Sequence, residues 1–251
     1  MDGCLIIQAV NEPTMHSVSS PSSSVQTPSI RLDNITLQRS NTVVFQHLTL
    51  ALTEPRIGLI GDNGAGKSSL FRLICGLDQP QSGHVLRPSG PQAVGMLFQN
   101  PDDQIIFPTV EEELALSLNH LKLSRAQAQL QVRDWLQARG LADWAPRAIG
   151  SLSQGQRQHV CWLALMIASH QTLLLDEPYA SLDLPNQALL HRDIAQANAQ
   201  IMVSTHVLDH VRHFGRVIWL DKGQVRADGA GLDVCAAYEA DVASRTNSSQ
   251  A

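Results

Sequence analysis

Short apolar runs recur along the chain from residue 30, whereas residues 1–29 are poor in structural signals. Residues 17–29 consist mostly of Ser, Pro, Thr and Val. Such a stretch buries too little apolar area to offset the entropy that is lost on ordering. We therefore expect residues 1–29 to be disordered, and we expect Met15 to be an alternative start codon to Met1.

From residue 30 the pattern indicates regular elements. Alternating apolar residues over 30–52 predict strands of an edge sheet, and the apolar runs 57–60 and 94–98 are typical of strands buried on both faces of a parallel sheet. Helices are predicted at 67–75, 154–168, 185–198 and 207–213, strands at 172–175 and 201–204, and a closing strand pair at 216–220 and 224–227. This alternation indicates an α/β domain over residues 30–237 with a mostly parallel sheet, followed by a flexible polar tail at 238–251.

Residues 100–150 interrupt this alternation. Thr109 precedes Glu112 by three positions and Ser124 precedes Gln127 by three, which is the spacing of a capping box at a helix start. Gly140 is a helix stop signal. The segment is therefore predicted as an inserted helical subdomain.

The strand at 57–60 and the helix at 67–75 enclose a candidate phosphate-binding loop. Its residues fit the pattern GxxxxGK[ST]: Gly61, Asp62, Asn63, Gly64, Ala65, Gly66, Lys67 and Ser68, followed by Ser69. Glycines let backbone N–H groups turn toward phosphate oxygens, and the helix N-terminus adds positive potential. Lys67 supplies a cation for the phosphates and the Ser68 hydroxyl a ligand for Mg²⁺. A chance glycine-rich turn is the alternative, and the loop alone is shared by kinases, GTPases, helicases and transporters.

Two acids, Asp176 and Glu177, end the apolar strand at 172–175. Ligands of open α/β sheets bind at the carboxyl ends of strands. Asp176 is a candidate for holding Mg²⁺ through water, and Glu177 for orienting and deprotonating an attacking water. The alternative is a strand that ends in solvated acids, and the upstream phosphate loop argues against it.

Composition and charge exclude several classes of protein. The 18 basic and 23 acidic residues give a net charge of -5 without a basic run, which disfavours a nucleic-acid binder. The four cysteines form no CxxC pair, so a zinc site or disulfide framework is not expected. The longest apolar stretch, 160–168, is shorter than the ~20 residues of a membrane span, and no signal peptide is recognisable. If the chain is part of a transporter, we expect the membrane-spanning part to be another chain.

Further motifs identify a family. Residues 152–156, Leu-Ser-Gln-Gly-Gln, resemble the LSGGQ signature of ABC ATPases and precede Asp176 by about 20 residues. Gln99 resembles the glutamine of the Q-loop, residues 181–183 (Ser-Leu-Asp) resemble the D-loop, and His206 resembles the switch histidine. The order and spacing of the motifs are specific, and the resemblance covers residues 30–229. It implies an ABC-type P-loop ATPase with a mostly parallel core sheet, an antiparallel β subdomain and an inserted helical subdomain.

The resemblance also implies roles for these residues. ATP and Mg²⁺ are the implied cofactors, with Ser68, Gln99 and Asp176 as metal ligands and Glu177, His206 and Gln99 as catalytic residues. Ser153, Gly155, Gln156 and Asp183 would act on the nucleotide held by a partner subunit, within a head-to-tail homodimer or heterodimer. The aromatic that often stacks on adenine in this family is missing from residues 37–40, which leaves Arg39 or Phe45 as candidates. Gln154 replaces the third residue of the signature, a variation that we expect to preserve activity.

One branch of the family is the most similar. Residues 98–104 (Phe-Gln-Asn-Pro-Asp-Asp-Gln) and 107–114 (Phe-Pro-Thr-Val-Glu-Glu-Glu-Leu) resemble the ATPases of energy-coupling-factor importers of vitamins and transition-metal ions. Residues 143–144 and 217–220 look most like the ATPase of biotin importers, and next like that of cobalt or nickel importers. The implied partners are a transmembrane coupling subunit and a substrate-binding membrane subunit, at the cytoplasmic face of the membrane. Residues 105–107 would either face the coupling subunit or pack in the core.

Two other classes stay open at this point. The first is an ABC ATPase of translation or DNA repair, but the chain has a single set of motifs, an acidic net charge and no visible coiled coil or zinc module. The second is a scaffold subunit that binds ATP without hydrolysing it. The presence of Glu177, Gln99 and His206 argues against that role.

Overall fold

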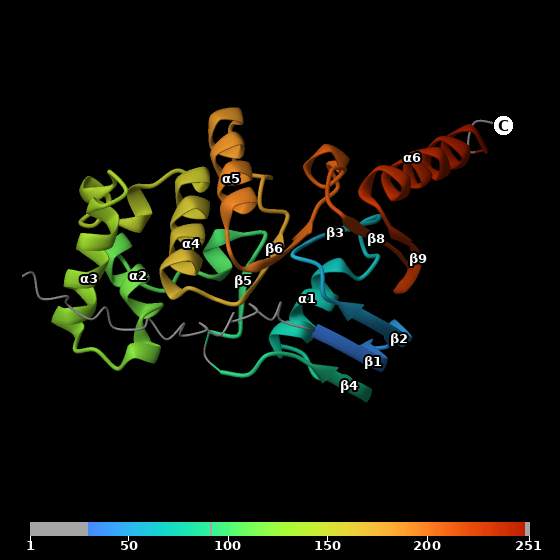
Figure 1. Cartoon of the computed structure of the whole chain (residues 1–251), viewed down its shortest axis with the longest axis horizontal. Helices are drawn as coiled ribbons and strands as arrows, with labels where there is room; N and C mark the ends of the chain where they lie inside the picture. The colour runs from blue at the N-terminus through green and yellow to red at the C-terminus, as the bar shows by residue number, and fades with distance from the viewer. Residues whose placement is uncertain (1–29, 91, 249–251) are drawn as a thin grey trace, which may run out of the picture.

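The computed structural model describes residues 30–90 and 92–248, so the predicted disordered segment 1–29 lies outside the described residues (Figure 1). The described residues form nine strands: β1 (Ile30–Arg39), β2 (Thr42–Leu52), β3 (Arg56–Ile60), β4 (Ser82–Leu86), β5 (Val94–Leu97), β6 (Thr172–Asp176), β7 (Gln200–Ser204), β8 (Arg216–Asp221) and β9 (Gln224–Gly229). The α-helices of this part of the chain are α1 (Lys67–Cys75), α2 (Val110–Leu116), α3 (Arg125–Gln137), α4 (Gln154–Ala168), α5 (Leu184–Gln196) and α6 (Gly231–Ser248). Short 3-10 segments are η1 (Pro101–Asp103), η2 (Asn119–Leu121), η3 (Ala142–Trp144), η4 (Ile149–Ser151) and η5 (Leu208–His210).

A six-stranded sheet forms the centre of the molecule, in the order β5-β6-β7-β3-β8-β9. All its neighbouring strands are parallel except β8 and β9. Along β6, Leu173 and Leu175 face one hydrophobic cluster and Leu174 the other, because side chains alternate along a strand. The sheet is thus buried on both faces, and the prediction of an α/β fold with a mostly parallel core is confirmed.

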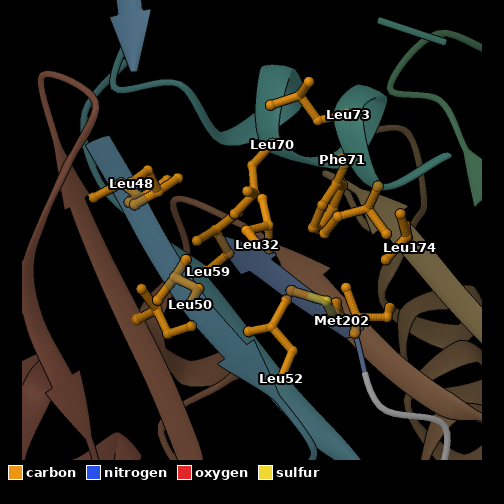
Figure 2. Close-up of a cluster of buried hydrophobic side chains, with 14 of the residues drawn as sticks. Leu32, Leu48, Leu50, Leu52, Leu59, Leu70, Phe71, Leu73, Leu174 and Met202 are labelled. Atoms are coloured by element: carbon orange, nitrogen blue, oxygen red, sulfur yellow. The ribbon is translucent and has the colours of Figure 1, made fainter. Parts of the chain in front are cut away.

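A second, antiparallel sheet has the order β2-β1-β4. Its apolar residues meet those of α1 and of the central sheet in one core, where Leu32 and Leu50 lie near Leu59, Leu70 and Phe71 (Figure 2). This core holds α1, and with it the loop before α1, between the two sheets. β4 was not predicted, because its sequence, Ser-Gly-His-Val-Leu, has no alternation of apolar and polar residues that would mark a strand.

The residues of the predicted helical insert form α2, α3 and the segments η1 to η4, at the end of the molecule opposite α6 (Figure 1). They share a core with α4 that includes Val110, Leu114, Val132 and Leu163. Ser124 caps α3 by accepting a hydrogen bond from the backbone N–H of Gln127 at 3.3 Å, and the Gln127 side chain accepts one from the Ser124 backbone N–H at 2.9 Å. This reciprocal capping confirms the capping box that was predicted at Ser124 and Gln127.

Two expectations about the C-terminal part are corrected. The tail expected to be flexible from residue 238 is helical as far as Ser248, because α6 buries Val234 and Cys235 against the central sheet. Its polar residues are held by contacts with distant segments, such as the ion pair of Arg212 with Glu239 at 2.5 Å. The predicted helix 207–213 is reduced to the 3-10 turn η5.

Candidate nucleotide-binding and hydrolysis site

A cavity of about 630 Å³ lies at the carboxyl ends of β3, β6 and β7. The structure brings most of the predicted site residues together in its lining, namely Gly61, Asp62, Asn63, Gly64, Gly66, Lys67, Ser68, Ser69, Gln99, Asp176, Glu177 and His206. Ala65 is the exception within the loop, because its side chain is buried below the surface. The place of the cavity agrees with the rule for ligands of open α/β sheets.

The loop between β3 and α1 has a shape that depends on glycine. Gly61 has φ 142°, and a Cβ there would lie 2.1 Å from the Leu220 carbonyl oxygen. Gly66 has φ 108° and precedes α1 without a side chain that caps the helix. The N–H groups of the first turn of α1 therefore have no side-chain acceptor, which is the arrangement that binds phosphate at a helix N-terminus.

Lys67 is buried at the start of α1 and points back along the loop. Its ammonium donates to the carbonyl oxygens of Gly61 at 2.7 Å and Asp62 at 3.1 Å. Burial lowers the pKa of Lys67, and the nearby carboxylates of Glu177, Asp176 and Asp62 oppose that shift. The side chain is thus a cation within a site that holds three carboxylates.

Asp176 and Glu177 stand at the end of β6. Asp176 is 5% exposed. Glu177 has a left-handed backbone with φ 49° and donates its N–H to the Ser204 carbonyl oxygen at 3.0 Å. Such a conformation costs about 1–3 kcal/mol in a residue other than glycine, and it recurs at active sites where the surrounding structure enforces it. It aims the carboxylate at His206, whose Nδ1 lies 2.9 Å from Glu177 Oε2.

The residues of the signature and the D-loop lie elsewhere. Ser153 caps α4 by accepting from the backbone N–H of Gln156 at 3.3 Å, while Gln156 Oε1 accepts from the Ser153 N–H at 3.0 Å. Gly155 packs so tightly that a Cβ would lie 2.9 Å from the Ser181 carbonyl oxygen. Asp183 caps α5 by accepting from Asn186 N–H at 3.1 Å. None of Ser153, Gly155, Gln156 or Asp183 lines the cavity at the phosphate loop.

The candidates for an adenine-stacking residue are not supported. Phe45 is 0% exposed and packs beneath Gly66, so its ring cannot meet a base. Arg39 forms an ion pair with Asp78 and does not line the cavity. Val44 and Tyr238 line it instead. Sequence reasoning missed Tyr238 because it belongs to α6, which was expected to be a tail, and no local pattern links it to the loop.

The residues available for a metal ion fit Mg²⁺. Among residues 30–90 and 92–248, no group of three His, Cys, Asp or Glu side chains is placed to hold a metal. Ser68, Gln99 and Asp176 line the cavity with one hydroxyl, one amide and one carboxylate. A hard oxygen donor set with few protein ligands suits Mg²⁺ that is also bound by phosphate oxygens.

Comparisons with known proteins agree with this geometry. A family model described as ABC transporter matches residues 45–180. The chain is 43% identical over 218 residues to the biotin transport ATP-binding protein BioM of Rhodobacter capsulatus, covering 83% of this chain and 93% of that protein. It is 36% identical over 204 residues to the BioM protein of Rhizobium etli, covering 78% and 91% of the two chains.

The fold is also that of a solved structure. CbiO1 from Clostridium perfringens, described as part of the ABC transporter complex cbiONQ, has a TM-score of 0.70 and 23% sequence identity, and the match covers 84% of this chain and 92% of that one. Within the described part of the chain, none of the helices combines the length and the hydropathy of a membrane span.

Proposed function

Because this chain belongs to the ABC transporter family, whose ATP-binding domains hydrolyse ATP, we propose that it powers an energy-coupling-factor importer of biotin. The observation that supports this proposal most strongly is the 43% identity to BioM of Rhodobacter capsulatus over 93% of that protein's length. The cavity that joins the phosphate loop to Glu177 and His206 supports the ATPase role. A transition-metal ion is the other substrate suggested by the sequence, and the experiment below separates the two.

In this proposal the loop residues 61–69 bind the phosphates of ATP. Lys67 and the N–H groups of the first turn of α1 face the same cavity. Ser68, Gln99 and Asp176 would hold Mg²⁺. When bound, this ion would neutralise phosphate charge and align the terminal phosphoryl group.

Glu177 is the proposed general base. Its carboxylate lines the same cavity as the phosphate loop, and its side chain is only 12% exposed. It would take a proton from a water that attacks the terminal phosphate. His206 Nδ1 lies 2.9 Å from Glu177 Oε2. We propose that this contact orients Glu177, while the other edge of the imidazole stays accessible to the nucleotide because the His206 side chain is 64% exposed.

The separation of the signature from the loop supports a head-to-tail dimer. Ser153, Gly155 and Asp183 are held at the starts of α4 and α5 and do not line the loop's own cavity. In a dimer they would instead meet the nucleotide of the partner subunit. ATP would then close the interface and hydrolysis would reopen it.

The proposed membrane partners are a transmembrane coupling subunit and a substrate-binding membrane subunit, at the cytoplasmic face. Ile105 packs against two core clusters, but Ile106 is 73% exposed and Phe107 is 38% exposed. Exposed apolar side chains a few residues after Gln99 in the chain suit a contact that passes movement from the nucleotide to the membrane subunits.

Purification of the tagged protein from gently solubilised native membranes tests this proposal. We expect two membrane proteins to co-purify, and we expect radiolabelled biotin uptake to stop in cells that carry Lys67→Ala. Cobalt or nickel uptake that stops while biotin uptake continues would reassign the substrate. Recovery of ribosomes or nucleic acid without a membrane protein would overturn the transport role.

A further inference from the structure

The C-terminal helix α6 reaches back to the phosphate loop and holds Asp62. The Tyr238 hydroxyl donates to Asp62 Oδ1 at 2.6 Å, and Arg245 Nη1 donates to Asp62 Oδ2 at 2.6 Å. Tyr238 lies edge-on against Trp219 of β8, with ring centroids 5.3 Å apart. Arg245 is also paired with Asp241, one helical turn earlier, at 2.8 Å. Both carboxylate oxygens of Asp62 thus have a partner on a distant segment that is itself held in place.

Asp62 is an unusual neighbour for a polyanion. In the described part of the chain, the cavity lining carries the carboxylates of Asp62, Asp176 and Glu177 and one basic side chain of the Lys or Arg type, Lys67. Asp176 is assigned to the metal ion and Glu177 to the attacking water. Asp62 has no such role, and an uncompensated carboxylate in the loop would repel the phosphates and lower their affinity.

The compensation comes from α6 and not from protonation. The hydrogen bonds from Arg245 and Tyr238 hold the pKa of Asp62 below its usual value, so it is charged at neutral pH. Burial, with Asp62 as a further cause, raises the pKa of Tyr238 to about 12. The Tyr238 hydroxyl therefore keeps the proton that it donates. The guanidinium of Arg245 supplies the opposite charge at hydrogen-bond distance.

We propose that Arg245 and Tyr238 are positioning residues for ATP binding, which neutralise and orient Asp62 so that this loop accepts the triphosphate. The inference rests on the proposed assignment of residues 61–69 to the phosphates. Arg245 acts through Asp62 and need not touch the nucleotide. The side chains of Arg245 and Asp62 are 49% and 46% exposed, so solvent and salt screen the pair and its effect is modest.

Calorimetric titration of the full-length protein with MgATP tests this inference, in a Glu177→Gln background that prevents turnover. Arg245→Ala is expected to raise the dissociation constant about 3- to 5-fold at low salt, with a smaller rise at high salt. Arg245→Lys should retain most of the affinity, because it keeps the charge. The double variant Asp62→Asn/Arg245→Ala should restore the parent value, because the phosphate loop then carries no carboxylate for Arg245 to neutralise. Arg192→Ala removes an exposed cation on α5 and should change nothing.

The outcomes separate the inference from the proposed function. A parent protein whose binding of MgATP is insensitive to Lys67→Ala would overturn the assignment of the loop itself. With that assignment intact, an Arg245→Ala variant that binds MgATP as the parent does would overturn the inference. The inference would also be overturned if Arg245→Ala lowered the affinity for MgATP and the added Asp62→Asn did not restore it. In that case α6 would act on the fold and not on the charge of Asp62.

Discussion

At the scale of single residues, Glu177, the proposed general base, is held from two sides. Glu177 is held by its backbone hydrogen bond to Ser204 and by the His206 imidazole. It is therefore preorganised before any nucleotide arrives, which is what a general base requires. Asp176 is its direct neighbour but is more deeply buried, which suits a metal ligand better than a base.

Glu177→Gln keeps the size of the side chain and removes its charge and its basicity. We expect turnover of ATP to fall about 10²- to 10⁴-fold, while ATP binding is retained. Phosphate release and calorimetric binding measure the two effects. Asp134→Asn is the matched control, because it makes the same change on the exposed face of α3. Unchanged phosphate release in Glu177→Gln would contradict the assignment of the base.

Three partly buried histidines make stability depend on pH. Burial lowers the pKa of His159, His170 and His210 below 6.5. Below that pH the unfolded chain binds more protons than the folded one, so the free energy of unfolding should decrease from about pH 7 to about pH 5. The melting temperature followed by circular dichroism measures this. His159→Gln should reduce the slope and the exposed His84→Gln should not; a melting temperature independent of pH in this window would contradict the argument.

At the scale of elements, the sequence predicted best those that local chemistry determines. The first and last residues of α1 were predicted correctly. Lys67 follows a glycine-rich loop, and Gly76 adopts the left-handed conformation that ends a helix. The reciprocal cap of α4 by Ser153 and Gln156 was also readable from the sequence, but those residues were assigned only to nucleotide contacts. β4 and α6 depend on packing against distant segments, which no local pattern records.

The same distinction applies to the site. The phosphate loop, Asp176 and Glu177 are short motifs with a direct chemical meaning, so sequence reasoning found them. The place of Tyr238 beside Asp62 depends on how α6 crosses the loop. Phe45 was a candidate for stacking on a base because residues 37–40 lack the aromatic that this family often has there, but its strand turns the ring into the core.

The position of Phe45 predicts a large effect on stability. Phe45 is 0% exposed on β2 and packs under Gly66 of the phosphate loop. Phe45→Ala should lower the free energy of unfolding by about 3–5 kcal/mol, because it removes buried apolar surface and leaves a cavity. Val43→Ala, on the same strand at 54% exposure, should change it by less than about 0.5 kcal/mol. Urea denaturation measures both; equal stability of the two variants would contradict the burial of the ring.

At the scale of the whole molecule, the phosphate loop and the signature residues lie at separate places on one chain. The phosphate loop, with Glu177 and His206, opens on one cavity, and Ser153 and Gly155 cap a helix that does not line it. A single chain is therefore an incomplete ATPase if the signature residues are required. In the proposed head-to-tail pair of chains, two equal sites would be completed, because each subunit would present both parts.

Mixing two inactive variants tests this arrangement. Lys67→Ala damages the phosphate loop and leaves the signature intact. Ser153→Asp keeps a residue that caps α4 well, but it places a negative charge where the partner's terminal phosphate would bind. Each variant alone should hydrolyse ATP poorly, and each should melt close to the parent temperature because its fold is preserved.

In a head-to-tail dimer, a mixed pair has one doubly damaged site and one intact site. Random association of equal amounts makes half of the dimers mixed, so the mixture should recover up to about a quarter of the parent ATPase activity if the sites act independently. Phosphate release of the mixture, compared with the sum of the two variants measured separately, is the readout. Activity equal to that sum, under conditions in which light scattering shows dimers that exchange subunits, would mean that each chain hydrolyses ATP alone. Recovery would instead place the signature of one subunit on the nucleotide of the other, as the proposed head-to-tail dimer predicts.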